Sequence, residues 1–480
     1  MTGDALLGFI MLVVMIGAIF IGFPISFTLL FLALAFGYLG LGEVVFSLAY
    51  FQTIGMMKEE LFAAVPLFIF MGYITEQAGL MERLFTAFRM ILAPVRGALF
   101  AVVILTAAVF AMATGIVGAA VTVLGIMASP IMIKTGYDAK LSAGAIAAGG
   151  TLGILIPPSV MLIVMGPVLG VSVAELYAAA FGPGFMLAGI YLVYLLGRAH
   201  INPKLGPPVP HAERVHSAAV LVREVLLGVV PLLALIAATL GTILGGLATP
   251  TEASAIGALG ACVLAVAYRK LSYAGLKRAV LSTTATTSMV MFLAVTSNIF
   301  GAVFARLGTA SWLTETMLAL PLSPVAMLVV VIVLIFVLGW PFEWPAIVLV
   351  FLPIFYPVVA ALKFDMIWFG ALVAVTLQTA FLSPPVAMSA YYLKQVVKEW
   401  SLGTIYKGMF EFMVLQCIAI ALLVAFPQIA TYLPDQLRSE QAGTKTEEVD
   451  DSRNRLEEDP LKALPERPQE PEPQSEKGTR

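Results

Sequence analysis

The chain has 480 residues, of which 60% are hydrophobic and only 12% are charged, and its mean hydropathy is +0.98. Soluble domains carry about 25% charged residues, so this composition excludes a soluble globular protein. The formal net charge of −2 gives no support to a nucleic-acid partner. The two cysteines, Cys262 and Cys417, lie far apart in apolar runs, which argues against a disulfide or a metal site.

Ten apolar runs in the body of the chain predict membrane helices, because a span needs about 20 apolar residues. In chain order they are residues 5–21, 24–41, 97–133, 141–165, 175–197, 225–247, 250–268, 324–360, 368–392 and 405–430. The first two runs are separated by little more than Pro24, which indicates a helical hairpin rather than a cleaved signal peptide.

Two of these runs, 97–133 and 324–360, are too long for one straight span. Each contains a weak point, which is Ala113-Thr114-Gly115-Ile116-Val117-Gly118 in the first run and Gly339-Trp340-Pro341-Phe342-Glu343-Trp344-Pro345 in the second. Glycine and proline are the residues that interrupt a helix. We therefore predict that both runs are broken, two-piece spans.

Two further apolar stretches, 55–82 and 283–310, carry polar groups that a simple span would not contain. Each has a central breaker, which is Pro66 in the first stretch and Thr296-Ser297-Asn298 in the second. We predict two re-entrant hairpins that dip into the membrane and return on the same side.

Two Pro-Pro pairs interrupt apolar runs in the same way. The segments are Gly150-Thr151-Leu152-Gly153-Ile154-Leu155-Ile156-Pro157-Pro158-Ser159 and Leu377-Gln378-Thr379-Ala380-Phe381-Leu382-Ser383-Pro384-Pro385-Val386. Each pair removes two backbone donors, and the freed carbonyls are tolerated in a membrane only inside protein or along a wet cavity. Matching proline-interrupted segments in two halves of a chain point to the binding site of a secondary transporter.

The breaks belong to an internal repeat. At an offset of 227 residues, Pro130 matches Pro357, Asp138 matches Asp365 and Pro157 matches Pro384. Each half holds five predicted spans and one hairpin, and an odd number of spans inverts the second half. We predict a first inverted repeat with its linker at 1–223 and a second at 224–433. Asp138 and Asp365 are predicted helix N-caps.

The charged residues gather after the repeats. Residues 438–480 hold 8 of the 27 Lys and Arg residues and 12 of the 29 Asp and Glu residues. This segment is rich in Glu, Pro, Gln and Lys and cannot bury a core, so we expect a disordered, solubilising tail.

Four polar residues inside apolar segments are candidates for cation binding. The oxygens of Thr296, Ser297 and Asn298 suit a hard cation such as Na⁺, although these side chains could instead bridge neighbouring helices. Glu343 lies between two prolines, and a carboxylate inside an apolar span is a functional-site hypothesis by default. The alternative is a carboxylate that reaches an aqueous face.

Five other residues each have a structural and a functional interpretation. Glu252 opens a predicted helix, where a carboxylate stabilises the helix dipole or serves the site. Gly115 and Gly118 allow tight turns or close helix packing. Thr151 and Gln378 lie at equivalent positions ahead of the Pro-Pro pairs, where they face a cavity or bond to neighbouring helices.

These motifs resemble a known family. The segment from Gly150 to Ser159 is similar to the signature of the large membrane subunit of tripartite ATP-independent periplasmic (TRAP) transporters. Ala248-Thr249-Pro250-Thr251-Glu252-Ala253 resembles that family's mid-chain motif, and Pro66-Leu67-Phe68 with Gly79-Leu80 resembles its first hairpin. The resemblance covers about residues 1 to 433.

The resemblance implies an all-α polytopic protein of the bacterial inner membrane, with an inverted-repeat, elevator-type architecture of two re-entrant hairpins and two broken helices. It implies import of an organic acid, such as a dicarboxylate, coupled to Na⁺, with no other cofactor. It also implies two partners, a small four-helix membrane subunit and a periplasmic substrate-binding protein that delivers the carboxylate.

Carried onto this sequence, the resemblance implies a substrate and cation site on the predicted breaks and hairpins. The second broken helix departs from the family's usual Met-Asp type sequence, so Glu343 stands where the family has Asp. The possible Na⁺ ligands are Ser297, Asn298 and Glu343. The whole candidate set is Pro66, Gly115, Gly118, Thr151, Pro157, Pro158, Ser159, Thr296, Ser297, Asn298, Glu343, Gln378, Thr379, Ser383, Pro384 and Pro385.

Two other classes of protein are alternatives to this interpretation. An autonomous inverted-repeat anion permease or exporter would have the same architecture and would need no binding protein. A membrane-embedded enzyme would need clustered His or acidic pairs, and the sequence has no His-Glu-x-x-His motif and no Gly-Lys-Ser/Thr phosphate loop. We therefore predict a transporter and not an enzyme.

Overall fold

The structure is a computed structural model that describes residues 3–208, 217–384 and 387–439. The chain forms two compact units, Met1–Tyr432 and Leu433–Arg480, and the described part of the second unit, 433–439, is helical. In these ranges every regular element is a helix. Eight of the described helices are long and apolar enough to cross a membrane, or nine if a bent pair forms one span. The predicted all-α polytopic membrane fold is therefore confirmed.

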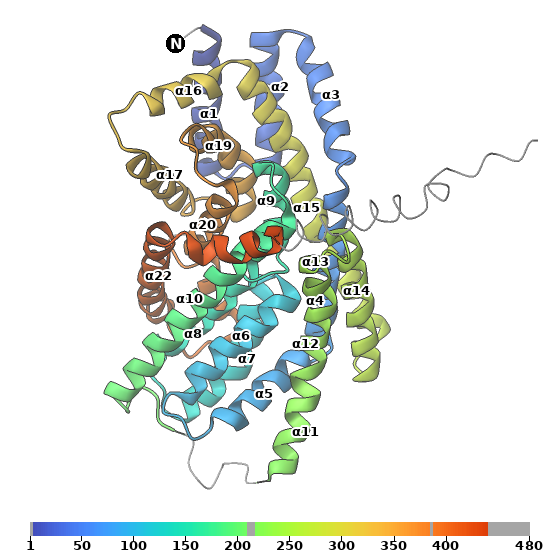
Figure 1. Ribbon diagram of the computed structural model, residues 1–480, viewed down its shortest axis with the longest axis vertical. Helices are drawn as coiled ribbons and strands as arrows, with labels where there is room; N and C mark the ends of the chain where they lie inside the picture. Colours follow the sequence, from blue (N-terminus) through green and yellow to red (C-terminus); the bar gives the residue numbers. More distant parts are fainter. Residues whose placement is uncertain (1–2, 209–216, 385–386, 440–480) are drawn as a thin grey trace, which may run out of the picture. The chain divides into compact units, whose positions relative to one another are not determined.

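The helices up to residue 201 make up the first half of the fold (Figure 1). They are α1 (Gly3–Ile21), α2 (Ile25–Leu41), α3 (Val44–Met57), η1 (Glu60–Ala63), α4 (Ala64–Gln77), α5 (Leu80–Leu92), α6 (Ala98–Thr114), α7 (Val117–Lys134), α8 (Ala139–Thr151), η2 (Leu152–Ile154), α9 (Val160–Leu169) and α10 (Val173–Ile201).

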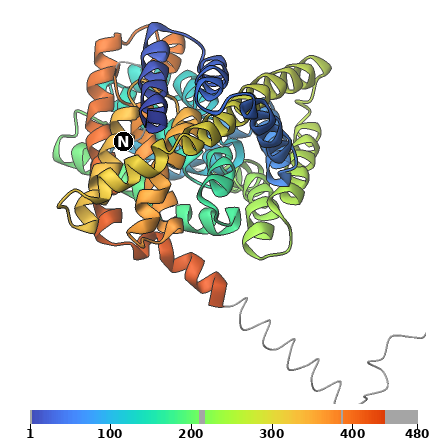
Figure 2. The same cartoon turned by 90° about the horizontal axis from the view of Figure 1, so that it is seen from above.

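The second half begins after the gap at 209–216. Its elements are α11 (Ala218–Gly228), α12 (Val230–Ile236), η4 (Ala237–Gly241), α13 (Thr242–Leu244), α14 (Pro250–Ala267), α15 (Tyr273–Arg306), α16 (Thr309–Leu318), α17 (Pro324–Leu338), α18 (Trp344–Ala346), η5 (Ile347–Phe351), α19 (Leu352–Ala361), α20 (Met366–Gln378), η6 (Thr379–Phe381), α21 (Met388–Val396) and α22 (Leu402–Ala425). Viewed from above, α11 and α14 stand together at one edge of the first unit (Figure 2).

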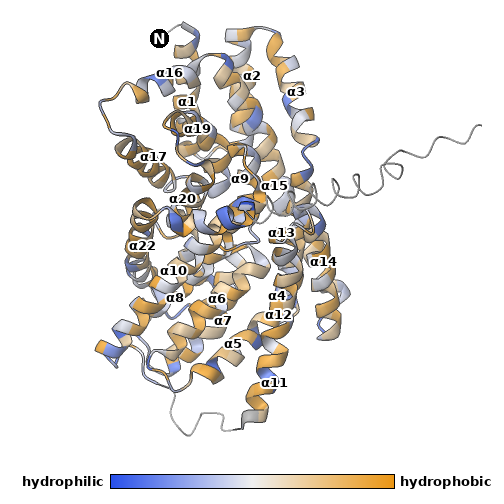
Figure 3. Ribbon diagram, in the orientation of Figure 1, coloured by the Kyte–Doolittle hydropathy of each residue, from blue (hydrophilic) through white to orange (hydrophobic). Residues whose placement is uncertain are grey.

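Most helices of this unit are apolar along most of their length (Figure 3). Phe31 and Leu259 are 70% and 68% exposed, as a lipid-facing surface requires. Inside, α8 and α22 approach closely because they meet at glycines. A Cβ on Gly408 would lie 2.1 Å from the carbonyl oxygen of Lys140, so no side chain fits at that crossing.

Hydrogen-bonded caps begin several helices, as the sequence predicted. A carboxylate oxygen of Asp138 accepts from the Leu141 N–H at 2.8 Å, and a carboxylate oxygen of Asp365 accepts from the Trp368 N–H at 2.8 Å. Glu252 forms a capping box with Thr249, in which each side chain bonds to the other's backbone N–H. These contacts confirm the predicted N-caps and give Glu252 the structural role.

The run 97–133 is a hairpin rather than a broken span. The Tyr137 hydroxyl, just beyond the end of α7, accepts from the N–H of Leu99 at the start of α6 at 3.3 Å. The N–H of Gly97 and the N–H of Asp138 donate to the neighbouring carbonyls of Gly206 and Leu205, both at 3.0 Å. Both ends of the run therefore lie on the same side, and the prediction of a two-piece span is wrong here.

The run 324–360 folds in the same way. Val325 and Leu328, at the start of α17, line one small cavity together with Lys363, Phe364 and Asp365, which follow α19. The run therefore also returns to the side it came from, and the prediction of a broken span is wrong for it too. We call α6–α7 hairpin 1 and α17–α19 hairpin 2. Figure 1 shows them in opposite halves of the unit, so they enter from opposite ends.

The two segments predicted as hairpins are not hairpins. Residues 283–310 lie mostly in α15, a continuous helix of 34 residues. Pro66 lies in the first turn of α4, where a missing N–H costs nothing, and the chain bends instead at 58–59 and between α4 and α5, where the angle is 60°. The fold thus has two hairpins and two broken helices, but in other segments than predicted.

The repeat extends to these long helices. The stretch from α3 to α4 runs from Val44 to Gln77, and α15 runs from Tyr273 to Arg306, so both ends match at an offset of 229. Contacts between the halves are also paired: α7 packs on α21 and η5 on α9, while α8 packs on α22 and α20 on α10. The division at 1–223 and 224–433 stays a prediction, and the predicted disordered tail lies outside the described residues except for 438 and 439.

Candidate functional site

The tip of hairpin 1 lies on the first Pro-Pro break. Gly115 reverses the chain with φ +60°, a left-handed conformation that glycine adopts without strain. A Cβ built on Gly115 would lie 3.6 Å from the carbonyl oxygen of Pro158 and 3.8 Å from that of Gly153. A Cβ on Gly153 would in turn lie 3.7 Å from the N–H nitrogen of Ile116. We call this contact junction 1.

A third element closes junction 1. A Cβ on Gly72 of α4 would lie only 2.6 Å from the carbonyl oxygen of Thr114, so the α4 backbone presses directly on the hairpin tip. Thr114 itself is buried, and its hydroxyl donates to the carbonyl of Phe110 at 3.2 Å. The tip is therefore held between α4 and the break.

The first break is buried and held by hydroxyl groups. The Ser159 hydroxyl donates to the carbonyl of Ile154 at 2.5 Å, and the Tyr177 hydroxyl donates to the carbonyl of Ser159 at 3.3 Å. The Thr151 hydroxyl donates to the carbonyl of Ala148 at 2.8 Å. The bond between Pro157 and Pro158 is cis. Thr151 and Ser159 thus shape the break by donating from their hydroxyls, and their oxygen lone pairs are not used in these bonds.

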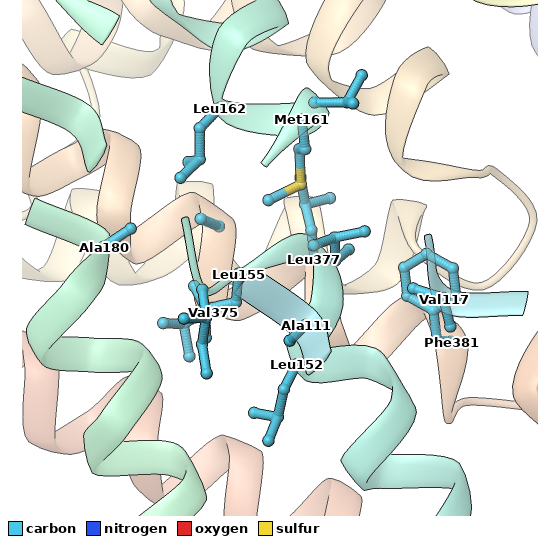
Figure 4. Packing of buried hydrophobic residues seen from close by; sticks show 14 of the residues in the cluster. Ala111, Val117, Leu152, Leu155, Met161, Leu162, Ala180, Val375, Leu377 and Phe381 are labelled. Carbon is cyan, nitrogen blue, oxygen red and sulfur yellow. The ribbon is translucent and has the colours of Figure 1, made fainter. Parts of the chain in front are cut away.

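The tip of hairpin 2 lies on the second break in the same way. A Cβ on Gly339 would lie 3.1 Å from the Cβ of Ala380, which follows Thr379 in the break. We call this contact junction 2. Apolar side chains of both breaks and of the hairpin 1 tip share one buried cluster (Figure 4).

The second break contains an unusual buried amide. Gln378 is fully buried, and neither its amide nitrogen nor its amide oxygen has a hydrogen-bond partner in the described part of the chain. An amide left without partners in the interior costs free energy, so it requires an explanation. The neighbouring hydroxyls are satisfied, because Thr379 donates to the carbonyl of Thr376 and Ser383 to that of Thr379, both at 2.7 Å. Pro384 is exposed, and Pro385 lies outside the described residues.

The three predicted Na⁺ ligands do not come together. Ser297 and Asn298 line a cavity of about 580 Å³ between α3, α15 and α19, whereas Glu343 lines a separate cavity of about 530 Å³. The Ser297 hydroxyl already donates to the carbonyl of Leu349, and the Thr296 hydroxyl donates to that of Phe292 at 3.0 Å. Hydroxyls can bond back to the preceding turn of a helix, so this polar triplet does not break α15. Among the described residues no group of three His, Cys, Asp or Glu side chains forms a metal site.

The structure adds residues that the sequence did not single out. A Cβ on Gly118 would lie 3.0 Å from the ring of Tyr392, which is also within electrostatic range of Glu343 and Tyr73. The Tyr73 hydroxyl lies 3.3 Å from that of Thr286. These residues join α4, α7, α15, α21 and hairpin 2, and only the folded chain brings them together.

The geometry defines a membrane protein with two opposed hairpins, each of which ends on a broken helix. Comparison with known proteins gives the family: residues 12–429 match the tripartite ATP-independent periplasmic transporter, DctM component. The chain belongs to this family and is a large permease component of such a transporter. Membership implies a small permease subunit and a periplasmic binding protein as partners, and it places the chain among transporters rather than enzymes.

Several relatives carry functional names. The chain is 29% identical over 426 residues to the sialic acid TRAP transporter large permease protein SiaM of Vibrio cholerae, covering 88% of this chain and 96% of that protein. It is 30% identical over 381 residues to the C4-dicarboxylate TRAP transporter large permease protein DctM of Pseudomonas aeruginosa, covering 78% and 86%. It is 27% identical over 433 residues to the ectoine TRAP transporter large permease protein TeaC of Halomonas elongata, covering 89% and 98%.

A solved structure shares the fold. The YdaH transporter of Alcanivorax borkumensis matches with a TM-score of 0.59 at 16% identity, over 82% of this chain and 90% of that one. At this identity the match shows the fold alone.

Proposed function

We propose that this chain imports an organic acid across the inner membrane of a bacterium, coupled to Na⁺, by an elevator movement of its hairpins and broken helices. The observation that carries the proposal is the pair of junctions, where each hairpin tip meets the broken helix that follows it in the chain. Helices broken inside a membrane supply free carbonyls for a cation and helix N-termini for an anionic substrate.

Na⁺ binds at the two junctions in this proposal. At junction 1 the carbonyl oxygens of Gly153 and Pro158 both lie beside the Gly115 tip. Carbonyl oxygens suit Na⁺, and the hydroxyl oxygens of Thr151 and Ser159 keep their lone pairs, because these groups act as donors in their own hydrogen bonds. Near junction 2 the amide of Gln378, which has no hydrogen-bond partner among the described residues, supplies a further oxygen in this proposal. This assignment replaces the trio of Ser297, Asn298 and Glu343.

The moving body consists of the hairpins and the broken helices α8–α9 and α20–α21. The fixed body contains α3 and the long helix α15, which contacts hairpin 2 through Ser297 and Leu349. Bound Na⁺ orders the junctions and the substrate carboxylate then binds against the helix N-termini, so each ligand raises the affinity for the other by the same factor.

The proposed partners are a small four-helix membrane subunit and a periplasmic binding protein that delivers a carboxylate. The named relatives handle sialic acid, C4-dicarboxylates and ectoine, so the family accepts solutes of different shapes. The binding protein, a separate chain, would set most of this choice.

The test is uptake into proteoliposomes that contain this chain and its small subunit. Candidate carboxylates are offered with and without the binding protein, and with and without an inward Na⁺ gradient. We expect uptake only when both are present. Uptake that needs neither would overturn the proposal and favour an autonomous permease.

A further inference from the structure

A second cavity lies beside the tip of hairpin 2 and has an unusual combination of walls. It has a volume of about 530 Å³ and opens between the α1–α2 turn, the middle of α15 and the start of α18. Most of its lining is apolar, with Pro24, Ile25, Met289 and Leu293 among the lining residues. One carboxylate, that of Glu343, enters this apolar surface.

The charge of this cavity is uncompensated. No Lys, Arg or His is among the residues that line it. Within the described ranges Glu343 forms no ion pair, since the ion pairs there join Arg198 to Glu411 and Arg438 to Asp435. A carboxylate inside an apolar span is costly unless a partner neutralises it. Glu343 is itself exposed, so its carboxylate is accessible to a positively charged group from outside the described chain.

Two aromatic rings stand beside this carboxylate in the cavity wall. Phe27 and Phe292 meet edge to face with ring centroids 5.2 Å apart, and both line the cavity. They are 64% and 37% exposed, so the rest of the described chain does not cover either ring completely. Aromatic faces attract cations, and a carboxylate with aromatic walls is suited to an ammonium group that carries apolar carbon.

We propose that this cavity binds an organic ammonium group on an apolar frame, with Glu343 as the counter-ion and Phe27 and Phe292 as aromatic walls. A cation is favoured over an organic anion, because the carboxylate of an anion would face that of Glu343 and no basic residue is among those that line the cavity. The site is distinct from the two junctions and goes beyond the proposed import of an organic acid.

The position of the cavity determines which parts of the protein a bound ligand touches. Its walls come from the α1–α2 turn and α15 on one side and from hairpin 2 on the other. A bound cation therefore bridges two parts of the protein that the elevator proposal moves apart. Two sources share this chemistry: the ammonium group belongs to the transported solute itself, or to a separate amine that holds hairpin 2 in place.

The test is direct binding to the full-length chain in nanodiscs, which does not depend on transport. The probes are benzyltrimethylammonium and phenylacetate, which have the same ring and opposite charge, and binding is followed by calorimetry. We expect benzyltrimethylammonium to bind and phenylacetate not to bind. Glu343→Gln should weaken binding of the cation by at least about tenfold, and Phe292→Leu by about threefold.

The matched control is Glu315→Gln, which removes an exposed carboxylate on α16 outside the cavity lining and should leave binding unchanged. Equal binding of phenylacetate, or unchanged cation binding in Glu343→Gln with the melting temperature preserved, would overturn the proposal. If Glu343→Gln does not fold, unchanged cation binding in Phe292→Leu would overturn the proposal instead.

The two sources are separated in proteoliposomes. Entry of labelled benzyltrimethylammonium into vesicles would assign the cavity to the transported solute. Inhibition of uptake without entry would assign it to a separate amine. If benzyltrimethylammonium neither enters the vesicles nor inhibits uptake, the bridging position is refuted. Because binding is measured without transport, a failure of the elevator proposal stays distinguishable from a failure of this one.

Discussion

Gly72→Ala gives the sharpest test of junction 1. The added methyl would lie 2.6 Å from the Thr114 carbonyl oxygen, 3.1 Å from its Cα and 3.2 Å from its carbonyl carbon. All three are backbone atoms, so no flexible side chain can move aside. An ordinary contact of about 3.5 Å would require the tip to move by roughly 1 Å, and overpacking of this kind costs about 1–3 kcal/mol.

This displacement of the hairpin tip should lower the apparent affinity for Na⁺ in transport. If the tip carries part of the Na⁺ site, a cost of about 1.4 kcal/mol or more in the bound state lowers the apparent Na⁺ affinity about tenfold. The assay is the Na⁺ dependence of substrate uptake in proteoliposomes, together with thermal melting of the purified chain. Gly189→Ala is the matched control, because a Cβ at that position in α10 meets nothing within 4 Å. Normal uptake with normal Na⁺ dependence in Gly72→Ala would refute the reasoning.

Three further substitutions separate binding from structure. Gln378→Leu should lower the apparent Na⁺ affinity and leave the melting temperature unchanged or higher, because an amide without a protein partner is removed; a large loss of stability with unchanged affinity would give the amide a purely structural role. Tyr177→Phe deletes the hydrogen bond to the Ser159 carbonyl and should cost about 1 kcal/mol, measured by thermal or denaturant melting, while an unchanged melting curve would contradict the claim that this bond holds the break. Thr249→Ala removes the capping box of α14 and should destabilise the chain by about 1 kcal/mol with no change in Na⁺ affinity, whereas a specific change in coupling would return a functional role to this motif.

The sequence was sufficient for features that depend on local chemistry. Apolar runs located the apolar helices, although they did not separate spans from hairpins at 97–133, 324–360 and α15. The N-caps at Asp138 and Asp365 and both Pro-Pro breaks needed only local backbone rules. The repeat was visible because prolines, aspartates and glycines recur at nearly constant offsets. A chain of 60% hydrophobic residues allowed no soluble alternative.

The direction of the chain after a break could not be predicted in this way. A kinked span and a reversed hairpin present the same apolar pattern, so the turn at Gly115 was interpreted as a kink. The polar triplet from Thr296 to Asn298 looked like a tip, although its hydroxyls bond within α15 or to hairpin 2. Whether a segment kinks, reverses or continues as a helix depends on contacts with residues far away in the chain.

The site itself is built from long-range contacts. Tyr73 meets Thr286 across 213 residues, and Gly118 packs against Tyr392. Nothing in the local sequence marks Gly72 or Tyr392 as neighbours of the hairpin tips. The positions of the breaks were therefore predictable, whereas the contacts around them and the placement of Ser297 and Glu343 in different cavities required the fold.

In the proposed elevator mechanism, hairpin 2 moves relative to α15 during transport. The contact between Ser297 and Leu349 allows this to be measured. Cysteines introduced by Ser297→Cys and Leu349→Cys, with the native Cys262 and Cys417 replaced by serine, are joined by a short bifunctional thiosulfonate reagent, which forms a reducible disulfide with each cysteine. Each single variant is a control. The elevator account predicts that the cross-link stops uptake and that reduction restores it. Undiminished uptake by the fully cross-linked protein would contradict the account.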